Sequence, residues 1–326
     1  MPVQDNVILE EKSLEQELPK DKKTLKREAK AQKKLLKKKA KEEQKRNKIR
    51  RIKTLTPYAR IVPYIMEDRV GSQNFVFDKI DMEPIDRYVK KKQAEGLKYF
   101  NLMHVIIAGY VRSVSQFPGL NRFIRGQKVY TRELVEVSLV IKREMSIDSP
   151  DTVIKVLFEP NATADDVYHK LNDKIEEYRN QPESSFDKLA KVLNFIPGIF
   201  LRWTVTTLRF WDYLGWLPKF LTNLSPFHCS FFITSMGSLG IPPIVHHLYD
   251  FGTLPIFCSF GSTQRELKLM EDGTVCKHRY VDVTYNLDER ICDGFYYAAG
   301  MKYMRAIYRN PEKLDTPPEK IVKDIK

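Results

Sequence analysis

The chain has 326 residues, which is enough for one large domain with a sizeable core. Its hydrophobic content of 42% is ordinary for a soluble protein, and no apolar run reaches the roughly 18 residues that a transmembrane helix needs. The first twenty residues lack the pattern of a signal peptide, and the four scattered cysteines indicate reduced thiols rather than a disulfide framework or a metal site. Together these features predict a cytoplasmic protein.

The net charge of +13 is concentrated near the N-terminus. Lys20–Lys53 holds 18 Lys or Arg and four acids, a sum of +14, so the other residues sum to −1. Good helix formers fill this stretch, and we interpret residues 1–54 as a basic, partly helical or disordered arm. The simplest interpretation is a solvated extension. The sharper one is contact with an acidic partner or an anionic membrane surface, where the protein would be peripheral. Nucleic acid is the least favoured partner of the arm, because no aromatic residue that could stack on bases precedes Tyr58.

Residues 55–315 read as one α/β domain, followed by a tail over 316–326. The helix predicted over residues 102–117 has enough apolar residues to be buried. The helix predicted over residues 163–179 begins at Thr163, a good N-cap residue followed by Asp165 and Asp166. Hydrophobic periodicity predicts strands over 74–80, 129–141, 153–158 and 280–287, and helices over 84–92, 102–117, 163–179 and 294–308.

The stretch 186–227 interrupts this pattern with aromatic residues. It contains all three tryptophans of the chain, Trp203, Trp211 and Trp216, mixed with basic residues. Breaks at Pro197-Gly198 and Leu217-Pro218 predict two short helices. Three interpretations stay open: a core or subunit-contact helix, the substrate-binding wall of a long acyl-chain pocket, and a membrane-interface segment.

Two later stretches carry motifs. Residues 231–240 read Phe-Phe-Ile-Thr-Ser-Met-Gly-Ser-Leu-Gly, and residues 288–294 read Asp-Glu-Arg-Ile-Cys-Asp-Gly. They resemble Phe-Thr-Ile-Ser-Asn-Leu-Gly-x-x-Gly and Asp-His-Arg-x-x-Asp-Gly of the chloramphenicol acetyltransferase-like family, which includes the catalytic cores of the 2-oxoacid dehydrogenase acyltransferases. The resemblance implies an α/β fold with a two-layer mixed sheet and helices, a homotrimer with active sites between subunits, and coenzyme A or acyl-CoA as co-substrate without a bound cofactor or metal.

The resemblance also assigns roles to single residues. It places Thr234 as the hydroxyl that stabilises the oxyanion, with Ser235 beside it as a substrate-binding residue. In the second motif, Asp293 would hold the loop through a structural ion pair, Gly294 would permit a tight turn, and Arg290 would be a further structural residue.

The motif departs from the family at the proton acceptor, because the catalytic histidine falls on Glu289. A glutamate near its ordinary pKa of about 4.3 is a poor base for a thiol or hydroxyl, unless burial raises that pKa. His246 and His247, in the loop after the Thr234 strand, are the alternative bases, although we favour a structural role for them by about two to one. His104 and His228 are expected to be satisfied core histidines.

Two functions therefore remain open. The first is an acyltransferase that moves an acyl group from acyl-CoA or an acyl carrier to a hydrophobic or lipidic acceptor. The second is a pseudoenzyme, an inactive scaffold on the same fold at a membrane surface or in an enzyme complex. The retained Thr234 strand and motif turn favour the enzyme.

Overall fold

The computed structural model describes residues 34, 38, 42, 46–142, 151–179, 193–269 and 271–326. The chain divides into two units, Met1–Arg46 and Asn47–Lys326. In the first unit the described residues Lys34, Lys38, Glu42 and Arg46 are helical, and the rest of the predicted arm up to that point lies outside the described residues.

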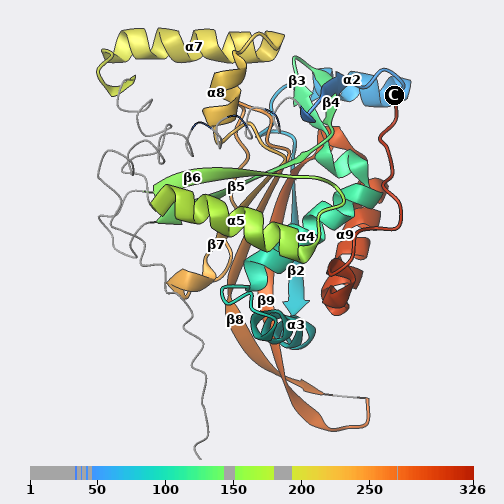
Figure 1. Ribbon diagram of the computed structural model, residues 1–326. Helices are drawn as coiled ribbons and strands as arrows, with labels where there is room; N and C mark the ends of the chain where they lie inside the picture. Colours follow the sequence, from blue (N-terminus) through green and yellow to red (C-terminus); the bar gives the residue numbers. More distant parts are fainter. Residues whose placement is uncertain are drawn as a thin grey trace, which may run out of the picture. The chain divides into compact units, whose positions relative to one another are not determined.

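The second unit is built on a six-stranded mixed sheet (Figure 1). The middle strands β5, β7 and β8 run parallel, and the outer pairings are antiparallel, so the predicted mixed sheet is confirmed. In spatial order the strands are β2 (Gln73–Asp81), β9 (Val275–Asp288), β8 (Ile256–Leu269), β7 (Phe231–Ser235), β5 (Val135–Lys142) and β6 (Asp151–Phe158).

A small three-stranded sheet and the C-terminal segment differ from three boundaries that the sequence predicted. The strands of this sheet are β1 (Ile49–Arg51), β4 (Lys128–Arg132) and β3 (Phe123–Arg125), in that order. The predicted strand over 129–141 is thus two strands, β4 and β5, in different sheets. Because β1 pairs with β4, the domain begins before residue 55. The predicted tail also belongs to the domain, since Lys53 and Thr54 donate backbone hydrogen bonds to the carbonyl of Lys326.

Four helices build the main core on one face of the large sheet (Figure 1). They are α3 (Met82–Ala94), α4 (Leu102–Gln116), α5 (Ala164–Arg179) and α9 (Gly294–Arg309). The sheet contributes alternate residues, among them Phe231, Ile233 and Cys258, because successive side chains of a strand point to opposite faces. Short 3-10 turns follow at Pro118–Asn121, Gly237–Leu239, Glu289–Ile291 and Pro311–Leu314.

The other face of the large sheet carries a small cluster of Phe232, Phe257, Leu248 and Leu254. The remaining helices are α2 (Pro57–Ile65), α7 (Gly198–Leu214) and α8 (Lys219–Leu224). The helix breaks predicted before Gly198 and after Leu217 are confirmed, but α7 has 17 residues and is not short. Within the described ranges, no helix is long and apolar enough to cross a membrane.

His104 shows how α4 begins. Asn101 accepts from the backbone N–H of Met103 at 3.0 Å, and the backbone N–H of Asn101 donates to Nδ1 of His104 at 3.2 Å. The imidazole stacks on Phe100 with centroids 5.3 Å apart. Nδ1 also lies 3.0 Å from Oδ1 of Asn101, and Nε2 is buried without a partner among the described residues. Burial therefore lowers the pKa of His104 to about 4.

Acid should destabilise the domain through His104. His104 takes up a proton near pH 6.5 in the unfolded chain and only near pH 4 in the folded chain. The contribution of neutral His104 to the free energy of unfolding is therefore fully present above pH 6.5 and is lost as the pH is lowered to about 4. The loss is about 3 kcal/mol. In His104→Gln, where glutamine keeps the capping contact, urea unfolding between pH 7 and 4 should show a correspondingly smaller loss. An unchanged pH dependence in this variant would contradict the assignment.

Candidate functional site

Thr234 lies near the end of β7, on the sheet face away from the four core helices. It pairs with Ser259 of β8, and both side chains share the face of Phe232 and Phe257. The side chain is half-buried, and its hydroxyl has no hydrogen-bond partner among the described residues. Ser235 is the next residue in the strand and points to the opposite face. The side chains of Thr234 and Ser235 therefore lie on different faces of the sheet.

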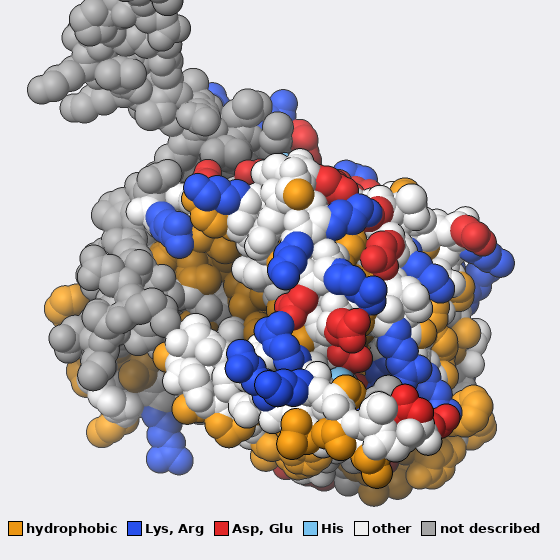
Figure 2. Space-filling model, turned by 90° about the horizontal axis from the view of Figure 1, so that it is seen from below, with side chains coloured by type: hydrophobic (Ala, Val, Ile, Leu, Met, Phe, Trp, Pro, Cys, Tyr) orange, Lys and Arg blue, Asp and Glu red, His pale blue; other side chains and the backbone are white. Residues whose placement is uncertain are grey.

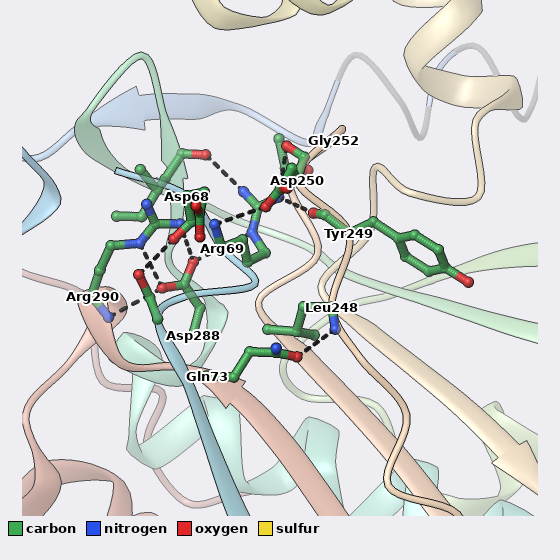
Figure 3. Close-up of polar contacts among 12 residues, drawn as sticks. Asp68, Arg69, Gln73, Leu248, Tyr249, Asp250, Gly252, Asp288 and Arg290 are labelled. Atoms are coloured by element: carbon green, nitrogen blue, oxygen red, sulfur yellow. Dashed lines mark hydrogen bonds and ion pairs between the residues drawn. The ribbon is translucent and has the colours of Figure 1, made fainter. Parts of the chain in front are cut away.

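The loop after β7 lies over this face and is fixed by side chains of the sheet. The backbone N–H of Ile244 donates to Oγ of Ser259 at 3.1 Å, and Oγ1 of Thr284 donates to the carbonyl of Ile244 at 2.6 Å. Farther along, the backbone N–H of Leu248 donates to Oε1 of Gln73 at 2.7 Å (Figure 3). These contacts hold the loop in one place above β8 and β9.

His246 is held within this loop. Its ring stacks on Phe257 with centroids 4.0 Å apart and planes 2° from parallel, and on His247 at 4.7 Å. Nδ1 lies 2.7 Å from the carbonyl oxygen of His247, which can only accept, so Nδ1 carries the proton and Nε2 offers a lone pair. Burial lowers the pKa of His246, although its bond to the His247 carbonyl opposes that shift. His246 is therefore neutral at neutral pH, and His247 is exposed.

The motif turn is built around a buried carboxylate, Asp288 at the end of β9 (Figure 3). Arg290 donates to it twice, from Nε at 2.8 Å and from Nη2 at 2.9 Å, and Nε of Arg69 lies 3.3 Å away. Nη1 of Arg69 also donates to the carbonyl of Tyr249 at 2.6 Å, and its backbone N–H to Asp250 at 3.0 Å. The cluster thus joins the motif turn to the end of the His246 loop.

Asp293 and Gly294 differ from the sequence prediction. The carboxylate of Asp293 is exposed and accepts from the backbone N–H of Tyr296 at 2.8 Å, so it caps α9. The structural ion pair expected of Asp293 is made by Asp288 with Arg290 instead, because Asp288 is the carboxylate that the turn buries. Gly294 begins α9, and a Cβ there would meet Tyr297 at an ordinary 3.7 Å, so no tight turn requires it.

Glu289 and Thr234 are not brought together within one chain. The Glu289 side chain is exposed, and its backbone N–H donates to Ser72 at 2.9 Å. Across the sheet, Thr234 is level with Ser259 and Thr284. Glu289 follows Thr284 by five residues, or about 16 Å of strand. Within one chain, Glu289 therefore has neither a buried position nor a place beside the Thr234 hydroxyl.

The tryptophans do not form a buried wall. Trp203 on α7 and Trp216 after it are 77% and 70% exposed, and Trp211 is 41% exposed. An acyl-chain pocket would enclose such side chains. Within the single chain, the exposed tryptophans therefore do not enclose a pocket.

The anchor of α7 is a polar cluster that sequence reasoning missed. Asp212 is buried and accepts from Nε2 of His228 at 3.1 Å and from the backbone N–H of Gly252 at 3.1 Å. Burial would raise the pKa of Asp212, but His228, Arg125 and the Gly252 N–H more than offset this and lower it. Nδ1 of His228 lies 2.8 Å from Oγ of Ser225. All three side chains of this Ser–His–Asp row are buried, so we interpret it as structural.

Two solved structures share the fold described above. A probable dihydrolipoamide acetyltransferase from Listeria monocytogenes 4b F2365 is similar with a TM-score of 0.51 and 14% sequence identity, over 79% of this chain and 90% of its own. A chloramphenicol acetyltransferase is similar with a TM-score of 0.51 and 8% identity, over 80% of this chain and 100% of its own. No protein-family model and no curated protein sequence matches the chain.

The predicted fold is therefore confirmed. The chain has the chloramphenicol acetyltransferase-like fold, which it shares with these two acetyltransferases. At 14% and 8% identity the likeness establishes the fold and leaves the activity to be argued from the site.

Proposed function

We propose that this protein is an acyltransferase that moves an acyl group from coenzyme A, or from an acyl carrier, to a hydrophobic acceptor. One observation carries the proposal. The unpartnered hydroxyl of Thr234 lies on the sheet face that the next loop crosses, and that loop fixes the neutral imidazole of His246 with Nε2 as acceptor. A donor for an oxyanion and a proton acceptor are the two groups that acyl transfer requires.

The proposed reaction uses these two groups in order. Nε2 of His246 takes the proton of the acceptor's hydroxyl or thiol as that atom attacks the thioester carbonyl. The carbonyl oxygen becomes an oxyanion, and Thr234 donates a hydrogen bond to it. The tetrahedral centre then expels the thiolate of the donor, which recovers the proton from the imidazolium. The acceptor is acylated, and the donor leaves as a free thiol.

The distance between the His246 imidazole and the Thr234 hydroxyl is compatible with these reaction steps. The His246 ring stacks on Phe257 of β8. Two residues farther along β8 lies Ser259, which pairs with Thr234. Imidazole and hydroxyl are therefore within roughly 10 Å of each other. A tetrahedral centre with a hydrogen bond of about 3 Å at each end spans most of that gap. We assign the base to His246 rather than to exposed Glu289, and we keep His247 as its stacking partner.

The sheet face beside this site exposes several large apolar side chains. Phe75 and Phe77 of β2 are 48% and 66% exposed, and Val245 of the loop is also exposed. We propose that a second copy of the chain covers this face, in a homotrimer, and excludes water from the site. The apolar rim of Leu239 and Ile241 supports a hydrophobic acceptor.

The proposal is tested by release of free coenzyme A from acyl-CoA donors of increasing chain length, with fatty alcohols and thiols as acceptors. Turnover should fall as the pH is lowered, with a midpoint below 6.5, because a base whose pKa is lowered stays neutral to lower pH. No turnover with any donor would favour the inactive scaffold instead. A rate that is flat down to pH 4 would remove His246 as the base.

A further inference from the structure

The long helix α7 turns its apolar side outward. Its half-buried and buried positions are Leu201, Thr204, Leu208 and Asp212, spaced as one face of a helix. The opposite stripe consists of large side chains that remain exposed, with Ile199 at 81%, Trp203 at 77%, Phe210 at 58% and Leu214 at 39%. A surface helix of a soluble domain has the reverse arrangement, so this stripe marks an interaction face.

The short helix α2 also turns apolar side chains outward. Tyr58, Ile61 and Ile65 follow each other at helical spacing and are exposed, Tyr58 by 76% and Ile65 by 71%. The two helices flank the same turn, because α7 contacts β3 and α2 contacts β4. Figure 1 shows α2, α7 and the β3–β4 turn at one end of the domain. Their exposed apolar side chains therefore belong to one end of the molecule.

Basic side chains outnumber acidic ones at this end, although the exposed Glu67 and Asp68 follow α2 directly. Residues 47–66 contain five Lys or Arg and no acid. Residues 198–224 contain Arg202, Arg209 and Lys219, and their single acid is the buried Asp212. Four basic side chains, those of Arg51, Lys53, Arg60 and Lys128, line a cavity of about 450 Å³ beside α2.

The end of the domain that carries the β8–β9 hairpin differs. Figure 2 shows Lys and Arg interspersed there with Asp and Glu. Cross-strand pairs such as Lys79 with Glu266, at 3.3 Å, belong to these elements. Mixed charge is typical of a solvated surface, whereas large aromatics among mostly basic residues are typical of a surface that meets anionic lipid.

We propose that the face formed by α2, α7 and the β3–β4 turn docks onto an anionic lipid bilayer. The aromatic and aliphatic side chains of α2 and α7 enter the boundary between headgroups and acyl chains, with α7 in the plane of the interface. The basic residues around them contact lipid phosphates. The inference does not rest on acyl transfer, because none of these residues belongs to the Thr234 site.

Tryptophan fluorescence of the full chain tests this directly, since all three tryptophans lie between residues 203 and 216. With vesicles of phosphatidylcholine and phosphatidylserine, we expect a blue shift and quenching by lipids brominated in their acyl chains. Pure phosphatidylcholine should give a much weaker effect. Arg51→Gln and Arg60→Gln should each weaken binding by about fivefold, and Trp203→Glu by at least about tenfold. Leu267→Glu, an equally exposed change in the β8–β9 hairpin, is the matched control and should have no effect.

Two results would overturn the proposal. Vesicles that co-sediment with the protein while the tryptophan emission stays unchanged would show that the basic N-terminal segment binds lipid without this face. Absence of lipid binding, together with a loss of self-association in Trp203→Glu measured by sedimentation, would show that the face is a contact between copies of the chain.

Discussion

Asp288→Asn is expected to lower the free energy of unfolding by about 3–5 kcal/mol, because it leaves two buried guanidinium groups without their common carboxylate. Asp288 is fully buried, and Arg290 and Arg69 contact it at 2.8 and 3.3 Å. The asparagine keeps the shape of the side chain, so the loss reports on the charge. Urea unfolding measured by circular dichroism checks the value.

Asp293→Asn is the matched control for this experiment. It lies five residues away in the same motif, is exposed, and caps α9. Asparagine is also a good N-cap, so the change should stay within about 0.5 kcal/mol. Equal effects of the two substitutions would contradict the assignment of the structural ion pair to Asp288.

Thr234→Val should lower the rate of acyl transfer by about 10²–10³, the usual effect of removing one oxyanion donor. Valine keeps the branched shape and strand preference of threonine and removes only the hydroxyl. Thr234→Ser should retain most of the rate. Ser235→Ala, on the opposite face of β7, should leave it unchanged. Steady-state release of coenzyme A gives these rates, and a full rate in Thr234→Val would exclude the hydroxyl from catalysis.

Local patterns predicted most of the fold. The apolar runs before Gln116 and the cap at Thr163 are decided by neighbouring residues, and the structure has α4 and α5 there. Pairing between distant strands was less accessible. Arg50 and its neighbours read as part of a basic arm because nothing local shows that β1 pairs with β4.

The candidate site was predictable in its residues but not in its geometry. The motif contains three acids, Asp288, Glu289 and Asp293, and only burial distinguishes Asp288 from the other two. The anchor of α7 at Asp212 was not predictable, because its partners His228 and Gly252 come from other segments of the chain. The orientation of His246 depends on its stacking with Phe257, which no sequence spacing encodes.

We propose that the proton acceptor of this protein lies in the loop after the Thr234 strand and not at the motif position. The most direct measurement compares coenzyme A release by His246→Gln and Glu289→Gln at pH 7, after both are shown to unfold like the parent protein. We predict a loss of about 10²–10⁴ in His246→Gln and less than about threefold in Glu289→Gln. Loss of activity in Glu289→Gln with His246→Gln unaffected would contradict the claim and return the role of base to the motif turn.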